Sequence, residues 1–86
     1  MPLAHAQVAA ATTATQLAAA RQNRIACVLV QHGDAAVYIG SSGVTTSNGA
    51  MLAATTGAQM TVPGSDAIYG IVGTGTETVG VLEILA

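Results

Sequence analysis

Short apolar segments alternate with glycine-containing turns along almost the whole chain. Ten glycines punctuate the 86 residues, and the runs between them are rich in Val, Ile, Thr and Ala. Turn signals at intervals of about 8–12 residues, with short strands between them, are typical of small sandwiches and barrels. The pattern predicts an all-β protein: a small antiparallel β-sandwich, jelly-roll-like, with about seven to eight short strands.

The strand candidates can be placed individually. The clearest are Arg24–Gln31, Ala35–Ile39, Ala67–Val72 and Thr76–Leu85, and shorter ones lie at Met51-Leu52 and Ala58–Val62. Gln31-His32-Gly33-Asp34 and Gly73-Thr74-Gly75 have the composition of tight turns. We therefore predict two β-hairpins, over residues 24–39 and 67–85.

The strand candidate Arg24–Gln31 is apolar at both sets of alternating positions. Ile25, Cys27 and Leu29 share one face and suit a domain core, whereas Val28 and Val30 lie on the other. In an antiparallel sheet one face is commonly solvated and polar. The second apolar face therefore predicts that something outside the domain core covers this strand.

Residues 6–20 leave their secondary structure open. Their alanines favour a helix by propensity, but three threonines weaken that assignment and no clean 3.6-residue period appears. Alternation fits a strand or an extended arm at least as well. We divide the chain into an extended N-terminal arm, residues 1–11, and a single β-sandwich domain, residues 12–86.

Charge is scarce. The charged residues make up 7% of the chain, against about 25% in an ordinary soluble domain, and they are Arg21, Arg24, Asp34, Asp66, Glu77 and Glu83. We expect the four carboxylates to keep turns and outer faces soluble. No basic stripe suits nucleic acid, and no apolar run approaches the roughly 18 residues of a membrane span. Large uncharged surfaces on a small domain indicate self-association, so we expect the protein itself as a partner, with no nucleic acid and no membrane.

Candidate chemistry is sparse. A phosphate-binding P-loop requires lysine, which is absent, and the glycine that a dinucleotide fingerprint needs three residues after Gly75 is Thr78. His32 lies in a turn beside Asp34 without a recognisable nucleophile, and the lone Cys27 lies in an apolar run typical of a buried thiol. We predict a non-enzymatic protein with no catalytic, cofactor or metal site.

The order of segments resembles a group of small tailed-phage virion proteins. Residues 11–52, ATTATQLAAARQNRIACVLVQHGDAAVYIGSSGVTTSNGAML, precede a closing IYGIVGTGTETVGVLEIL at residues 68–85. In that group "TATxLLAANPNRxxLLIQNxG" leads into "VYIGxxGVTxxNGxxL", and "LYAIxxxGTxxVxVLE" ends the domain. The chain departs from the pattern at residues 21–24, which lack its proline, and at His32, where an asparagine is usual.

The resemblance implies an accessory structural protein of a phage particle. We expect a capsid cement or decoration protein, a homotrimer made in the host cytoplasm that binds the major capsid protein on the outer face of an icosahedral capsid. The alternative is a receptor- or glycan-binding tip domain of a fibre or tail, for which Tyr38 and Tyr69 would be the aromatic platforms. A small hydrolytic or ligand-binding enzyme is a third possibility.

Six residues are candidate partner or subunit contacts. Arg21 and Arg24 flank a polar pair before a long strand, where they form either a solvated turn or a polar anchor at an interface. The remaining four are the second-face residues Val28 and Val30 and the tyrosines Tyr38 and Tyr69.

Overall fold

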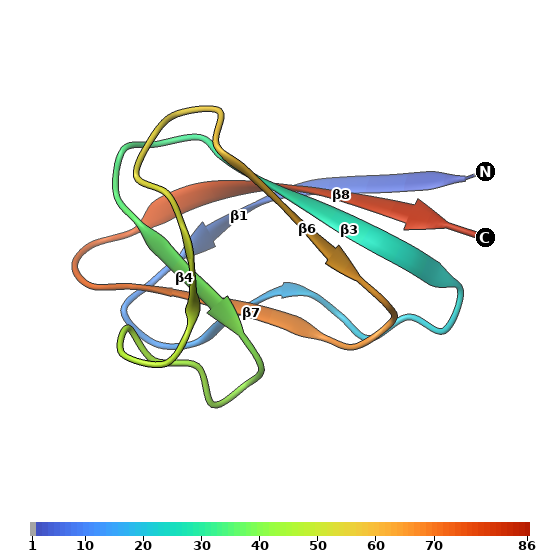
Figure 1. The fold of residues 1–86 in the computed structure, drawn as a ribbon, viewed down its shortest axis with the longest axis horizontal. Helices are drawn as coiled ribbons and strands as arrows, with labels where there is room; N and C mark the ends of the chain where they lie inside the picture. The colour runs from blue at the N-terminus through green and yellow to red at the C-terminus, as the bar shows by residue number, and fades with distance from the viewer. Residues whose placement is uncertain (1) are drawn as a thin grey trace.

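The computed structural model describes residues 2–86, which fold into eight strands and no helix (Figure 1). The strands are β1 (Leu3–Ala10), β2 (Thr15–Ala18), β3 (Arg24–Gln31), β4 (Val37–Gly40), β5 (Ala50–Leu52), β6 (Gln59–Pro63), β7 (Ile68–Val72) and β8 (Glu77–Leu85). Because these residues form no helix, none of them forms a helix that could cross a membrane.

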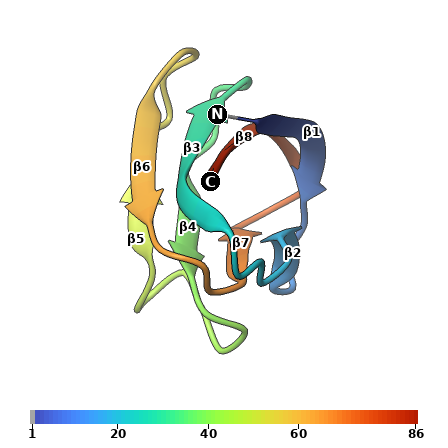
Figure 2. The same ribbon diagram turned by 90° about the vertical axis from the view of Figure 1, so that its right-hand side faces the viewer.

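Two four-stranded antiparallel sheets face each other. Sheet A has the strand order β1-β8-β3-β6 and sheet B the order β2-β7-β4-β5 (Figure 2). All neighbouring strands in both sheets are antiparallel. This is the strand order of an eight-stranded jelly roll, so the predicted fold class is confirmed.

Both predicted hairpins are wrong. β3 lies in sheet A and β4 in sheet B, and β7 and β8 are likewise divided between the sheets. The turns after β3 and β7 therefore carry the chain from one sheet to the other. Turn composition specifies that the chain reverses, but not which strand the next segment bonds to. Within residues 2–86, the one pair of consecutive strands that bond to each other is β4 and β5, joined by residues 41–49.

The N-terminal segment is part of the sandwich. β1 pairs with β8 without interruption from Leu3 opposite Ile84 to Ala10 opposite Glu77. Over residues 3–10 the segment is therefore a strand of sheet A, and the predicted division into an arm of residues 1–11 and a domain of residues 12–86 does not follow the structure. Met1 lies outside the described residues. The alanine-rich segment forms a strand despite its helix propensity, because pairing with β8 satisfies the hydrogen bonds of its backbone.

The core lies between the inward faces of the two sheets. It is built from aliphatic side chains and one thiol, and the most enclosed are Leu29, Leu52, Val37, Val72, Val79 and Cys27. Strand β3 has its inward positions at Cys27 and Leu29, as the alternation predicted, and Cys27 is a free, buried cysteine. The prediction was wrong for Ile25, which is 44% exposed, because the register with β8 shifts between Arg24 and Ala26 and breaks the alternation there. Val44, in the β4–β5 connection, is also buried and packs beside Gly40 and Gly49.

Candidate interaction surfaces

The six predicted contact residues do not form one site. Val28 and Val30 lie half-buried on the outer face of sheet A, Tyr38 and Tyr69 lie half-buried on the outer face of sheet B, and the two arginines lie at one end of the sandwich. The strand registers place the valines and the tyrosines on opposite sides of the molecule.

The outer face of sheet A is largely apolar and carries no formal charge. The pairs Val28 opposite Leu82 and Ala26 opposite Ile84 align aliphatic side chains across β3 and β8. Leu3 and Leu82 expose 61% and 37% of their surfaces. From the registers, the outward positions of the four strands are Leu3, His5, Gln7, Ala9, Thr78, Gly80, Leu82, Ile84, Ala26, Val28, Val30, Gln59, Thr61 and Pro63. None of these carries a formal charge at neutral pH, counting histidine as neutral.

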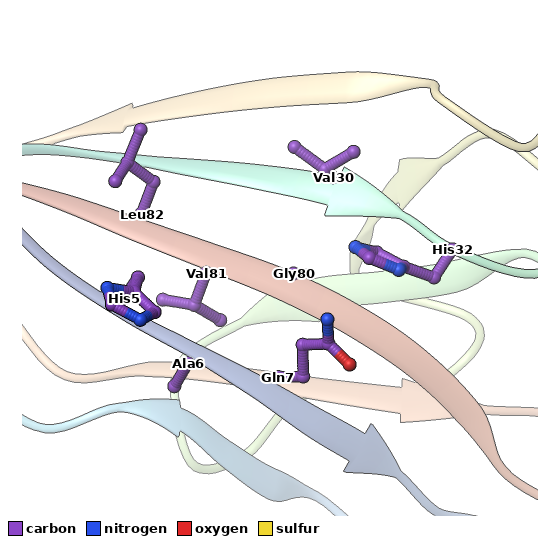
Figure 3. A pocket seen from close by; sticks show the side chains of 8 residues that line it. All are labelled: His5, Ala6, Gln7, Val30, His32, Gly80, Val81 and Leu82. Atoms are coloured by element: carbon purple, nitrogen blue, oxygen red, sulfur yellow. The ribbon is translucent and has the colours of Figure 1, made fainter.

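A shallow hollow of about 470 Å³ interrupts this face at Gly80 (Figure 3). Its lining includes Gln7, Val30, His32 and Leu82, which surround the position where Gly80 has no side chain. A Cβ at Gly80 would come within 2.6 Å of His32 Nε2, so the imidazole lies across the glycine. The side chains that line the hollow contain no serine, threonine or carboxylate. The hollow gives His32 no nucleophile to activate.

The outer face of sheet B is the second apolar surface. Tyr38 lies between Ile71 and Met51 in the strand registers, and Met51 is 58% exposed. Gln16 lies opposite Tyr69 and its amide donates a hydrogen bond of 3.4 Å to the phenol oxygen. These side chains also carry no formal charge.

Arg24 is an internal residue, whereas the sequence predicted either a solvated turn or a polar anchor at an interface. Its side chain is 1% exposed and donates hydrogen bonds to the carbonyl oxygens of Ala19 (2.8 Å), Gly64 (3.2 Å) and Asp66. The guanidinium offers five N–H groups in a fixed planar fork. It therefore ties together the β2–β3 and β6–β7 connections, which are far apart in sequence.

Glu83 is buried beside Arg24, against the expectation that the carboxylates keep outer faces soluble. Its Oε2 lies 3.6 Å from Nη1 of Arg24 and 3.2 Å from Nε of Arg21. This oxygen accepts no hydrogen bond from the described residues, so it is held by charge. Glu83 follows Val79 and Val81 at the same inward alternation of β8, and that spacing was the signal available in the sequence.

Arg21 is 44% exposed and reaches Glu83 from the rim of the sandwich. It lies in the connection before β3, which was predicted to be either a solvated turn or an interface anchor. Its guanidinium is paired with the carboxylate of Glu83. At this end of the sandwich, the guanidinium groups of Arg21 and Arg24 therefore both lie beside the same carboxylate. A partner contact through Arg21 stays a prediction.

Gln31 and Glu77 are two further polar residues whose roles in the fold were not predicted from the sequence. Gln31 is 1% exposed, and its amide donates to the carbonyl oxygens of Ala35 (2.7 Å) and Ala53 (3.3 Å). Glu77 accepts a hydrogen bond of 3.1 Å from the N–H of Ala35. Both side chains hold the β3–β4 connection. Gln31 follows Cys27 and Leu29 at the inward alternation of β3. By contrast, nothing local marks the bond between Ala35 and Glu77, which are 42 positions apart.

Titratable chemistry on the described residues is limited. No group of three or more His, Cys, Asp or Glu side chains is arranged to hold a metal ion among residues 2–86. Burial raises the pKa of the Cys27 thiol, an effect that nearby Arg24 partly opposes. A neutral buried thiol is a poor nucleophile and a poor metal ligand.

No protein-family model matches the chain, and no curated protein sequence does either. A solved structure from Bacillus endospore appendages, described as a novel family of disulfide-linked pili, is similar in fold, with a TM-score of 0.52. The match covers 98% of this chain and 89% of that chain at 22% identity. It shows a shared fold across almost the whole domain.

The comparison corrects the functional expectation. The similar structure belongs to bacterial spore appendages and not to a phage capsid-binding protein, so the assignment as a capsid cement or decoration protein is contradicted. The sequence resemblance rested on low-complexity segments in a certain order. Such segments describe the strands and turns of a small jelly roll, which proteins of different function share.

Proposed function

We propose that this protein is a non-enzymatic structural subunit that assembles with further copies of itself into an extended polymer. The observation that carries the proposal is the pair of apolar, uncharged surfaces on the opposite outer faces of the sandwich. Each places aliphatic or tyrosine side chains where a lone sandwich usually presents polar ones. Two such surfaces on opposite sides provide two contacts per subunit.

Two contact surfaces on opposite sides of a subunit lead to a polymer of unlimited length. A contact that uses one patch on both copies closes into a dimer, whereas two contacts on opposite sides continue from copy to copy. Stacking sheet A of one subunit on sheet A or sheet B of the next leaves an unused face at each end. A chain of subunits therefore grows without a defined limit.

Self-association fits the charge distribution. Two identical faces without formal charges meet without repulsion and without a charged group to desolvate. Burial of apolar surface contributes roughly 25 cal/mol per Å², and a standard interface buries about 800 Å² on each partner. Leu82 lines the hollow at Gly80 and is 37% exposed, so it would lie within such an interface.

The fold comparison supports the same class of function. The similar structure comes from endospore appendages described as disulfide-linked pili. Linkage by disulfides does not carry over to this chain, because its single cysteine is Cys27, which has no exposed surface. Assembly of this protein would rest on noncovalent surfaces.

Light scattering on purified protein over a range of concentrations tests the proposal, together with electron microscopy of negatively stained samples. We expect a mass that rises with concentration and elongated particles. A monomer at every concentration would overturn self-assembly. A discrete trimer, which the sequence resemblance implied, would overturn open-ended growth.

A further inference from the structure

Strand β1 is an open edge of sheet A, and it differs from the other three edges of the sandwich. It has eight residues, whereas β6 has five, β2 four and β5 three. β6 ends in Pro63, which lacks an N–H group, and the register of β2 is irregular between Gln16 and Ala18. Within residues 2–86, β1 pairs with β8 alone, and Figure 2 shows it at the margin of the sheet.

The backbone groups on the open side of β1 can be assigned from the ladder. The N–H of Leu85 donates to the carbonyl of Pro2, which makes these two residues a hydrogen-bonded pair. Such pairs recur at every second residue of an antiparallel ladder. Ala4, Ala6, Val8 and Ala10 therefore bond to β8, while Leu3, His5, Gln7 and Ala9 direct both N–H and C=O away from it.

Within residues 3–10, β1 has none of the sequence features that usually block strand addition. Folded proteins commonly prevent strand addition with an edge lysine, an internal proline, a bulge or a covering loop. β1 reads LAHAQVAA, contains no charged residue and no proline, and pairs in unbroken register. Alanine also has low intrinsic strand propensity, so a second ladder would stabilise β1 further.

We infer that β1 is the site where a second copy of this chain adds its own β1, antiparallel, to join two sheets A into one continuous sheet. One register uses every outward group: Leu3 opposite Ala9 of the second copy and His5 opposite Gln7 of the second copy. Each such pair exchanges two N–H···O=C bonds. The same register matches an apolar side chain with an apolar one and an imidazole with an amide, which hydrogen-bond to each other.

This pairing rests on the proposed function and specifies one contact of the assembly. The two-fold axis passes beside Ala6, which lies opposite Ala6 of the second copy. Joined in this way, the outer faces of the two sheets A form one wider uncharged surface. The paired unit then presents that surface and two sheet B faces to further copies.

Substitution at Gln7 tests the backbone pairing. Gln7→Pro removes an outward N–H that makes no bond to β8, so the sandwich keeps its own ladder. Gln7→Thr is the matched control, because it changes the side chain and retains the N–H. We expect Gln7→Pro to lower the average mass in solution at least twofold, and Gln7→Thr to retain the wild-type mass. Circular dichroism and thermal unfolding verify that both variants fold.

Cross-linking tests the register. Ala6→Cys places two thiols at a non-hydrogen-bonded pair, where the Cα atoms lie about 4.5 Å apart, within the range of a disulfide. Ala4→Cys is the control, since Ala4 lies opposite Val8 of the second copy. We expect mild oxidation to give a covalent dimer with Ala6→Cys and almost none with Ala4→Cys.

The outcomes separate this inference from the proposed function. If the wild type assembles but Gln7→Pro assembles equally, or if Ala4→Cys cross-links as readily as Ala6→Cys, the β1 pairing is wrong and self-assembly stands. If Ala6→Cys gives a dimer and nothing larger ever forms, the β1 pairing stands and the extended polymer is wrong. A monomer under all conditions overturns both.

Discussion

One end of the sandwich buries charged side chains, whereas its outer faces expose apolar ones, which is the reverse of the usual arrangement. At one end, Arg24 and Glu83 are buried in contact with each other, two of only six charged residues in the chain. On the outer faces, side chains such as Leu3 and Met51 are exposed to more than half of their surfaces. A small domain normally has its apolar side chains inside and its charges outside.

The two regions have different consequences for the free energy of folding. The Arg24 guanidinium is satisfied by backbone carbonyls and a carboxylate, so it specifies how distant connections meet, although a buried pair adds little net stability over an apolar replacement. The outer faces add less to the fold of one copy than the core does, because their side chains are only half-buried or exposed. They gain free energy when another molecule covers them, so one region serves the fold and the other serves association.

The largest expected effect is the loss of the Arg24 side chain. Arg24→Ala leaves Glu83 buried with only Arg21 as a partner and three carbonyl oxygens without their donor. We expect a loss of about 3–5 kcal/mol in the free energy of unfolding, measured by denaturant titration. Arg21→Ala is the control and should cost about 0–1 kcal/mol, because its side chain is 44% exposed. Equal losses would show that burial does not distinguish the two arginines.

The second prediction concerns the apolar interior. Leu29 has no exposed surface and packs in the core between the sheets. Leu29→Ala should lower the free energy of unfolding by about 2–5 kcal/mol, through lost burial and the cavity left behind. Val28→Ala, one position away on the outer face, is the matched control and should cost less than half as much. A larger loss from Val28 would mean that the outer face contributes to the fold of one copy as much as the core does.

The third prediction uses the Cys27 thiol as a probe of burial. Burial raises its pKa above the ordinary value of 9.0, so the unfolded chain ionises first as the pH rises. The stabilisation from the neutral thiol is complete below pH 9.0 and is lost as the pH rises through the folded-state pKa. Relative to Cys27→Ala, the wild type should lose up to about 1.4 kcal/mol per pH unit between pH 9.0 and the folded-state pKa, measured by denaturant titration. Parallel pH profiles of the two proteins would contradict a buried thiol.

The smallest effect on the fold is expected on the outer face of sheet A. Leu82→Lys introduces a charge at a side chain that is 37% exposed. The free energy of unfolding of the monomer should stay within about 0.5 kcal/mol of the wild type, while the mass in solution falls. Leu82→Met retains an apolar side chain of similar volume and should assemble as the wild type does. Unchanged mass in the lysine variant would exclude this face from the contact.

Local pattern located most of the strands. The alternation at Arg24–Gln31 gave the bounds of β3, and the segments Ala67–Val72 and Thr76–Leu85 match β7 and β8 to within a residue. The same alternation placed Val28 and Val30 away from the core. These features depend on neighbours along the chain, since a strand's side chains point alternately to its two faces.

Local pattern did not predict which strands pair with each other. The hairpin interpretation of residues 24–39 and 67–85 was wrong, because a glycine turn permits a reversal within one sheet or a crossing to the other. The roles of Arg24 and Glu83 were missed for a related reason. Arg24 bonds to Gly64 and Asp66, and nothing near Arg24 in the sequence names those acceptors.

By itself the sequence determined the class of the protein: an all-β domain with little charge, one buried thiol and strands that are apolar on both faces. The tertiary structure decided the order β1-β8-β3-β6 over β2-β7-β4-β5, the burial of the Arg24–Glu83 pair, and the open edge at β1. The physical reason is the sequence distance over which each interaction acts. Alternation and turn propensity act over a few residues, whereas ladders, ion pairs and exposed edges depend on segments that meet only after the chain has folded.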